Sequence, residues 1–136
     1  MIPRKYREGD APSLTALWRA SFPDYTGYNA PEAILAAKLA VDDHLYVIED
    51  DGEVVASCLV GYDGHRGWLY AVAVAPSHRG QGLGRRIVDH AIERLRGMGC
   101  VKVNLQIRGG NDAVADFYRR LGFDIEERIS MGRRLT

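Results

Sequence analysis

The sequence contains few cysteines and no long hydrophobic run. Only 2 of its 136 residues are cysteine, Cys58 and Cys100. Both lie in apolar segments and they do not form a C-x-x-C pair, which predicts reduced, buried thiols in a cytoplasmic protein. No segment approaches the ~20 consecutive apolar residues of a membrane-spanning helix. The N-terminal MIPRKYREGD also lacks the hydrophobic stretch of a secretory signal, so we expect a cytoplasmic location and no membrane association.

Ligands for a metal ion are also scarce. The chain has 4 histidines, and His44, His78 and His90 do not show the spacing that metal ligands require. We therefore expect these residues at the surface or at its boundary, and we expect no metal site.

The chain has no net charge, because 18 Lys and Arg balance 18 Asp and Glu. Neutrality argues against nucleic acid as a partner, since proteins that bind it usually present a basic surface. The balance conceals an uneven distribution. Residues 1–78 contain 6 Lys and Arg against 11 Asp and Glu, whereas residues 79–136 contain 12 against 7. This asymmetry predicts an anionic ligand for the second half and is compatible with a cationic one for the first.

The length of 136 residues is that of one compact domain. There is no internal repeat, low-complexity tract or linker, so we expect a single domain over residues 1–136. The hydrophobic pattern predicts a mixed α/β fold in which an antiparallel meander feeds a βαβ crossover. The expected strands are 2–7, 45–49, 54–60, 68–74 and 101–107, with one or two more in 123–135. One helix is expected to begin after an N-cap at Asp10. Three more helices are expected at about 31–40, 82–98 and 112–121.

The most informative segment lies between the strand 68–74 and the helix that follows it. Glycines at positions 80, 82 and 84 form a dense turn at the start of that helix. The first N–H groups of a helix have no internal partner and carry a partial positive charge, so a glycine turn there is suited to phosphate oxygens. Arg79, Arg85 and Arg86 add positive charge. A purely structural turn is the alternative.

Two common nucleotide-binding motifs do not match this turn. A P-loop requires a Lys after the glycines, and none is present. The dinucleotide fingerprint requires G-x-G-x-x-G after the first strand of a parallel sheet, whereas the spacing here is G-x-G-x-G in the middle of the chain.

The segment Arg79-Gly80-Gln81-Gly82-Leu83-Gly84 resembles the R/Q-x-x-G-x-G/A signature of the GNAT family of N-acetyltransferases. The later block, with Asn111, Tyr118, Gly122 and Phe123, is similar to a second helix motif of that family. Further segments resemble the small bacterial YpeA-type acetyltransferases within it. The resemblance implies a mixed sheet of six to seven strands, with about four helices and two central parallel strands that splay apart.

The resemblance also implies a co-substrate, acetyl-CoA, and the residues that hold it. Its pantetheine arm is expected along the main chain of Val72, Ala73 and Val74, with an N–H near Val74 polarising the thioester carbonyl. The residues expected at the pyrophosphate are Arg79, Gly80, Gln81, Gly82, Leu83, Gly84 and Arg85. Asn111 is expected at the pantetheine or phosphate region; a plain N-cap is its alternative role.

Catalysis in the family uses a tyrosine that protonates the leaving sulfur, and Tyr118 stands at that position. The alternative for Tyr118 is a core aromatic side chain. In several members of the family, a glutamate on the splayed strands acts as the general base. This sequence has Gln106 at the matching position, and its amide cannot accept a proton. The candidates for the base are then ordered water, Asp63 or His65. For Asp63 and His65 the alternative is that they only form the turn in which they lie.

The resulting hypothesis is an acetyl-CoA-dependent N-acetyltransferase that modifies a primary amine by direct attack in a ternary complex. The loop Phe22–Asn29 is expected to bound the acceptor, which is a small molecule or else a protein N-terminus or lysine. A non-catalytic acyl-CoA-binding or regulatory module is the alternative function. The sequence leaves open the acceptor, the acyl chain, and whether the protein is a monomer or a homodimer.

Overall fold

The computed structural model describes residues 1–136, which divide into two compact units, Met1–Leu105 and Gln106–Thr136. The expected single domain stays a prediction. The strands of the first unit are β1 (Arg4–Lys5), β2 (Leu45–Asp50), β3 (Glu53–Tyr62), β4 (Gly67–Val74) and β5 (Val103–Asn104). Its helices are α1 (Ala11–Ser21), α2 (Pro31–Val41) and α3 (Leu83–Gly97), with short 3-10 turns at Glu8–Asp10, Gly27–Asn29 and Pro76–His78. The second unit contains α4 (Asp112–Arg120).

The five strands form one mixed sheet in the order β1-β2-β3-β4-β5. The first four are antiparallel to their neighbours, and β5 runs parallel to β4. The β4–β5 pairing covers only Gly67 and Trp68 of β4, opposite Val103 and Asn104. β5 ends at Asn104, so no strand pairs with this edge of β4 beyond Trp68. The expected mixed α/β fold is confirmed, with β4 and β5 as its parallel pair. The expected count of six to seven strands is wrong.

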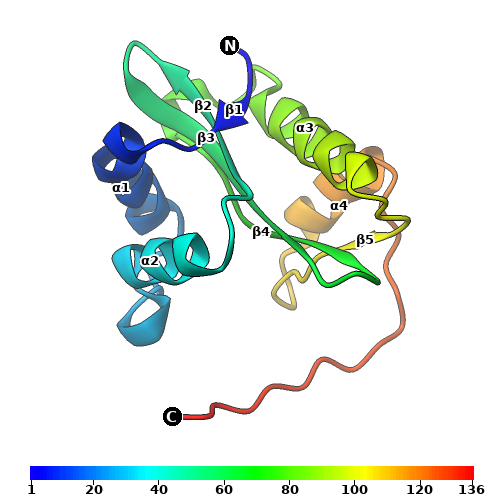
Figure 1. Cartoon of the computed structure of the whole chain (residues 1–136). Coiled ribbons are helices and arrows are strands. Elements are labelled where there is room, and N and C mark those ends of the chain that lie inside the picture. The colour runs from blue at the N-terminus through cyan, green and yellow to red at the C-terminus, as the bar shows by residue number, and fades with distance from the viewer. The chain divides into compact units, whose positions relative to one another are not determined.

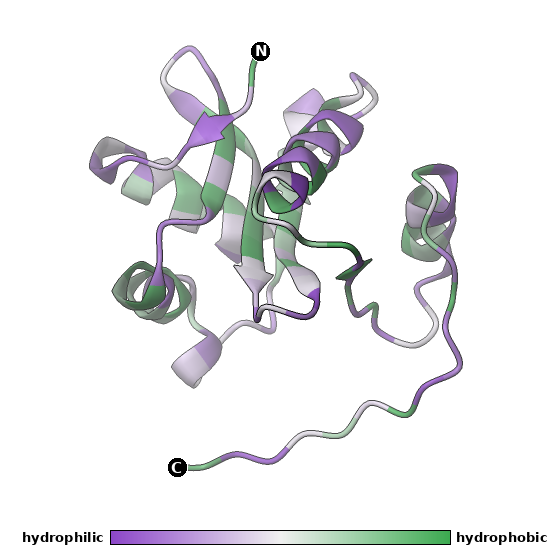
Figure 2. Cartoon of the chain, turned by 45° about the vertical axis from the view of Figure 1, so that its right-hand side comes forward, coloured by the Kyte–Doolittle hydropathy of each residue, from purple (hydrophilic) through white to green (hydrophobic).

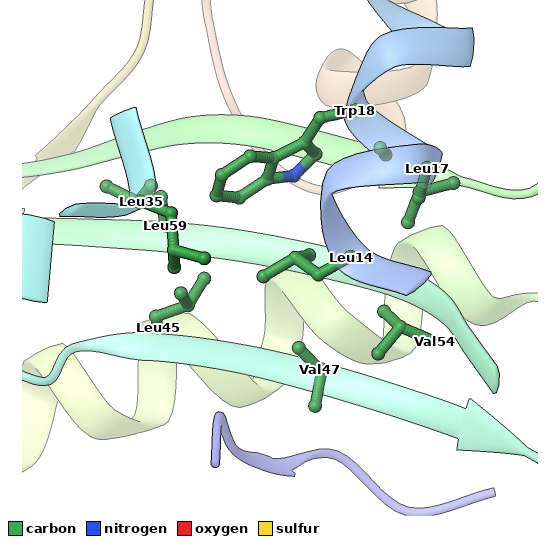
Figure 3. Close-up of a cluster of buried hydrophobic side chains, with 9 residues drawn as sticks. Leu14, Leu17, Trp18, Leu35, Leu45, Val47, Val54 and Leu59 are labelled. Atoms are coloured by element: carbon green, nitrogen blue, oxygen red, sulfur yellow. The ribbon is translucent and has the colours of Figure 1, made fainter. Parts of the chain in front are cut away.

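Helices cover both faces of the sheet, with α1 and α2 on one side and α3 on the other (Figure 1). The core on the α1 side is built around Leu14 and Trp18, each 0% exposed. Leu45, Val47, Val54 and Leu59 of the sheet point toward them, and Leu35 of α2 closes the cluster (Figure 3). Burying such a side chain contributes about 1.5–3 kcal/mol, so this cluster fixes α1 firmly on β3.

Several elements predicted from the sequence are shorter in the structure. The first strand is Arg4–Lys5 rather than 2–7, and the last is Val103–Asn104 rather than 101–107. The expected strands in 123–135 are absent, because this segment contains no helix or strand. Figure 2 shows its alternating hydrophobic and hydrophilic residues. Ile129 and Met131 are each 90% exposed. Alternation alone does not make a strand, since a strand needs a partner for its N–H and C=O groups.

The N-terminal strand is joined to α1 by ion pairs around Asp10. Asp10 occupies the N-cap position of α1, as expected, but its side chain makes no capping bond to that helix. Its carboxylate instead accepts two hydrogen bonds of 2.8 Å from Arg4 and one of 2.9 Å from the Arg7 N–H. Arg4 also donates to Glu49 on β2. One buried carboxylate therefore connects the start of the chain to the sheet and to α1.

Replacing Asp10 with Asn is expected to lower the free energy of unfolding at pH 7 by about 1–3 kcal/mol. Burial alone raises the pKa of Asp10, but the hydrogen bonds from Arg4 and Arg7 outweigh it and hold the pKa below its ordinary value of 3.8. The stabilisation is therefore complete above the pKa of the unfolded chain and is lost as the pH falls through the folded pKa. Urea unfolding at pH 7 and at pH 3 should show the difference between wild type and variant shrinking in acid. Glu8→Gln, an exposed carboxylate two residues earlier, is the control; an equal effect there contradicts the prediction.

Candidate functional site

The strand β4 contains a bulge in its centre. Leu59 of β3 lies opposite Tyr70 and Ser57 lies opposite Ala73, so Cys58 faces two residues of β4, Ala71 and Val72. Ala71 has a φ of 46°, in the left-handed region that an L-residue with a side chain rarely adopts. Such a conformation costs about 1–3 kcal/mol and persists only where neighbouring groups enforce it. The bulge is therefore a strained feature held by its surroundings.

Two buried side chains hold this bulge. The Ser57 hydroxyl donates a hydrogen bond of 2.9 Å to the Ala71 carbonyl. The Ser57 oxygen accepts a bond of 2.9 Å from the indole N–H of Trp18. Ser57 and Trp18 are both 0% exposed. The two hydrogen bonds, from Trp18 to Ser57 and from Ser57 to Ala71, form a relay that links α1, β3 and β4. The polar atoms of this relay all have hydrogen-bond partners, which is the condition under which buried polar groups are tolerated.

The bulge also reverses the direction of the backbone N–H groups along β4. The Gly67 N–H bonds the Lys102 carbonyl on the β5 side, at 2.9 Å. The Ala75 N–H, just beyond the strand end, bonds the Val55 carbonyl on the β3 side, at 2.8 Å. In a regular strand two residues separated by an even number of positions point to the same edge. The reversal leaves the N–H and C=O groups of Val72 and Val74 on the edge that β5 does not cover.

The turn after β4 leads directly into α3. Gly80 and Gly82 have φ values of 78° and 77°, so two left-handed residues form the turn. Gly82 is the N-cap of α3 and provides no capping side chain. Leu83 is buried and anchors the first turn of the helix. The first N–H groups of α3 therefore have no side-chain partner, an arrangement suited to an anion.

Arginines surround this helix start. Arg79 and Arg85 are exposed, and Arg85 lies 3.6 Å from Asp89 one turn later. Arg86 is also exposed and donates a hydrogen bond of 2.9 Å to the Met1 carbonyl. Because exposed ion pairs of this kind contribute little, Arg79 and Arg85 can turn toward a phosphate at small cost.

A histidine tether fixes the beginning of the turn. His78 hydrogen-bonds Asp50 at the end of β2 through Nε2 and the Ser77 hydroxyl through Nδ1, each at 2.7 Å. The turn before Arg79 is thus attached to the β2–β3 hairpin. His78 was expected as a surface or boundary residue, and it lies at the boundary, with 19% of its side chain exposed.

The remaining predicted site residues lie in the second unit. Asn111 occupies the N-cap position of α4, but its side chain makes no capping hydrogen bond. Tyr118 is buried, and its ring packs edge-on against Phe117 and Phe123, with centroids 4.9 and 5.5 Å away. Gln106 donates a hydrogen bond of 2.7 Å to Ser130. Both contacts of Tyr118 fit the core-aromatic alternative as well as an acid role.

The side chain of Asp63 and the backbone of His65, the two candidate bases outside the strands, take part in a hydrogen-bonded turn. Asp63 accepts hydrogen bonds from the N–H groups of Arg66 and His65, at 2.7 and 2.8 Å, which lower its pKa. A lowered pKa makes Asp63 a weaker base. The turn containing both residues precedes Gly67, whereas Val74 lies at the other end of β4. A strand rises about 3.3 Å per residue, which puts this turn roughly 20 Å from Val74.

No group of three or more His, Cys, Asp or Glu side chains in the structure is arranged to hold a metal ion. No helix is both long and apolar enough to cross a membrane.

Strand amides without a partner strand, followed by a glycine turn at a helix start, are suited to an extended ligand that carries phosphate. Residues 11–123 match the acetyltransferase (GNAT) family model. An acetyltransferase of Sodalis glossinidius (strain morsitans) is 36% identical over 134 residues, which cover 97% of this chain and 94% of that protein. The chain therefore belongs to the GNAT acetyltransferase family, whose members transfer an acetyl group from acetyl-CoA.

Solved structures support the same fold. A protein of Agrobacterium tumefaciens str. C58, whose acetyltransferase name is provisional, has a TM-score of 0.80 and is 29% identical, covering 98% of this chain and 100% of its own. An aminoglycoside N-acetyltransferase in complex with CoA has a TM-score of 0.78 over 98% of this chain and 94% of its own. It is 16% identical, so this likeness concerns the fold alone.

Three residues of the site were not predicted from the sequence, namely Trp18, Ser57 and Ala71. Trp18 was expected only as part of the apolar stripe of α1, and Ala71 as an ordinary position of a central strand. Ser57 gave the one available signal, since it is a polar residue within the apolar segment Val54–Val60. A hydroxyl there requires a buried partner, and the partner lies 39 residues earlier in the chain.

Replacing Gly82 with Ala is expected to weaken CoA binding about tenfold and to lower the melting temperature. An L-residue at a φ of 77° is strained, so the start of α3 would shift and misdirect its free N–H groups. Calorimetric titration with CoA and thermal unfolding measure the two effects. Gly97→Ala, at the other end of the same helix, is the matched control, because an added methyl group there meets nothing within 4 Å. Equal affinity of the Gly82 variant and wild type contradicts the assignment of the turn.

Proposed function

We propose that the protein transfers the acetyl group of acetyl-CoA to a primary amine, by direct attack of the amine in a ternary complex. One observation carries the proposal. The free edge of β4 presents the main-chain groups of Val72 and Val74 immediately before the anion-binding turn at Gly80–Gly84. An extended pantetheine arm ending in a pyrophosphate has complementary groups in the same order.

The cofactor residues follow from this arrangement. Val72 and Val74 bind the pantetheine arm as an added strand does, through main-chain hydrogen bonds. Ala73 was included among these contacts, but its N–H and C=O point toward β3, opposite Ser57, so its part is to space the other two. The pyrophosphate lies on the helix start, where the expected contacts are Arg79, Gly80, Gln81, Gly82, Leu83, Gly84 and Arg85. Asn111 contributes from the N-cap of α4, where its amide is not used for capping.

The Val74 N–H carries the electrostatic part of the mechanism. Acetyl-CoA supplies an activated acetyl group in its thioester. An N–H fixed in a strand donates to the carbonyl oxygen and stabilises the negative charge that develops there on attack. Because the strand holds this donor in place before the reaction, little free energy is spent on aligning it.

Tyr118 is the proposed acid for the departing thiolate. Its ring is fixed by the edge-on contacts with Phe117 and Phe123, which restrict the direction of the hydroxyl group. For the amine proton we propose water as the acceptor, since Gln106 cannot take a proton and the Asp63 carboxylate already accepts two backbone N–H groups.

The acceptor is proposed to lie against aromatic side chains of the first unit. In the loop 22–29, Phe22 and Tyr25 stack with centroids 4.6 Å apart, and Tyr28 is 63% exposed. Tyr70 was not among the predicted residues; it lies one position before the bulge, opposite Leu59, and is 50% exposed. Exposed aromatic faces attract ammonium groups, so an amine acceptor is compatible with this surface.

The free thiols of Cys58 and Cys100 support the cytoplasm as the compartment.

The function is tested by screening amines and peptides for CoA release with the purified protein. We expect release with a defined class of primary amines and acetylated product by mass spectrometry. Tight binding of acetyl-CoA without release for any amine would favour the non-catalytic binding module. Turnover with peptides alone would place the protein among enzymes that acetylate protein N-termini or lysines.

Replacing Tyr118 with Phe is expected to lower kcat about 100-fold or more, while the Kd for CoA stays close to that of wild type. The change removes the proton donor but keeps the ring that packs on Phe117 and Phe123. Steady-state kinetics and calorimetry measure the two quantities. Tyr62→Phe is the control, because that hydroxyl only donates to the Gly64 carbonyl within a turn. Unchanged kcat in the Tyr118 variant would leave only its core-packing role.

A further inference from the structure

We propose that Ser57 of β3, together with Trp18 of α1, is a positioning residue for acetyl transfer. The inference rests on the proposed function, because it concerns the amides that face acetyl-CoA on β4. Neither side chain reaches the reacting atoms. Both act on the bulge at Ala71, which determines the direction of the Val74 N–H.

The two edges of β4 exchange roles along the strand. Before the bulge, the Gly67 N–H points toward β5; after it, the Ala75 N–H points toward β3. The one extra residue in β4 is the cause of this reversal. A β4 without the bulge would turn the Ala73 N–H to the free edge and the Val74 N–H into the β3 ladder. The bulge therefore selects which amide can donate to the thioester carbonyl.

A hydrogen bond from Ser57 keeps the bulge in place. Alanine at a φ of 46° is unfavourable, and nothing in its own side chain favours that conformation. The Ser57 hydroxyl donates to the Ala71 carbonyl at 2.9 Å and so fixes the peptide group that the bulge rotates. The relay thus compensates the strain at the position where the strain occurs.

Trp18 determines the direction of the Ser57 hydroxyl. A serine O–H rotates freely unless its oxygen accepts a bond from elsewhere. The Trp18 N–H occupies that oxygen at 2.9 Å, which leaves the hydroxyl hydrogen for Ala71. Both residues are 0% exposed, so water does not compete for either bond. Trp18 therefore orients Ser57, and Ser57 orients the peptide group of Ala71.

The decisive variants are Ser57→Ala and Ser57→Thr. We expect Ser57→Ala to lower kcat about 10–100-fold, with the Kd for CoA within about threefold of wild type, because the phosphate turn is untouched. Ser57→Thr keeps the hydroxyl, and we expect it to retain most of the activity. Trp18→Phe keeps an aromatic ring but removes the N–H, and a smaller loss of kcat is expected, since Ser57 can still donate to Ala71.

A second substitution separates positioning from general destabilisation. Ala71→Gly allows the left-handed conformation without strain, so we expect it to restore kcat in the Ser57→Ala background. Val60→Ala, another buried position of β3, is the control. It should lower the melting temperature without lowering kcat at a temperature where the protein is folded.

Amide hydrogen exchange, followed by NMR in the unliganded protein, gives a readout that needs no activity. In wild type we expect slow exchange at Ala73, which pairs with β3, and fast exchange at Val74. Ser57→Ala should reduce or reverse this difference. An unchanged exchange pattern together with unchanged kcat would overturn the positioning role. Wild type that neither binds CoA nor transfers acetyl would overturn the proposed function instead, and the exchange pattern would still decide what Ser57 does to the bulge.

Discussion

The rest of the site depends on the two unlike edges of β4. One edge must stay in the β3 ladder so that the sheet holds together, while the other must leave polar groups open after Trp68. An exposed strand edge with unpaired N–H and C=O groups is ordinarily a hazard, because other chains can pair with it. Here β5 pairs with only two residues of β4 and ends there. The resulting edge is short and is followed at once by a charged turn, which restricts what can pair there.

The strain in β4 and the hydrogen bonds around it are of similar size. A left-handed alanine costs about 1–3 kcal/mol, and each of the two buried hydrogen bonds through Ser57 contributes about 0.5–1.5 kcal/mol. The relay therefore approximately offsets the strain without adding stability to the fold. Side chains that only stabilised the core would be replaced more simply by apolar ones, which require no partners. This balance indicates that the relay determines a direction of the backbone.

The parts of the structure that could be predicted from the sequence depend on local patterns. The helices around Trp18, Leu35 and Ile87 follow from periodicity, and the turn at Gly80–Gly84 follows from glycines beside a helix start. The bulge could not be predicted, because Ala71 is an ordinary residue in an apolar segment and its partners are distant in the chain. In the tail after Phe123, by contrast, the sequence predicts strands that the structure does not contain. Its alternation satisfies the local criterion for a strand, but a strand also requires a partner that the pattern does not specify.

The ion pairs in the structure limit what the uneven charge of the two halves of the chain implies about ligands. Much of the acidity of the first half is already paired, since Asp10 and Glu49 bind Arg4, and Asp42 binds Lys38 at 2.7 Å. Asp43 likewise binds Lys5 at 2.8 Å. Those carboxylates stabilise the N-terminal strand and the end of α2, so they do not supply a field for a cationic acceptor. At the start of α3, Arg79 has no acidic partner in the structure and Arg85 lies no closer than 3.6 Å to Asp89, which supports the expectation of an anionic ligand there. In the proposed function, selection among acceptors would then depend on aromatic side chains such as Tyr70 rather than on the paired charges of the first half.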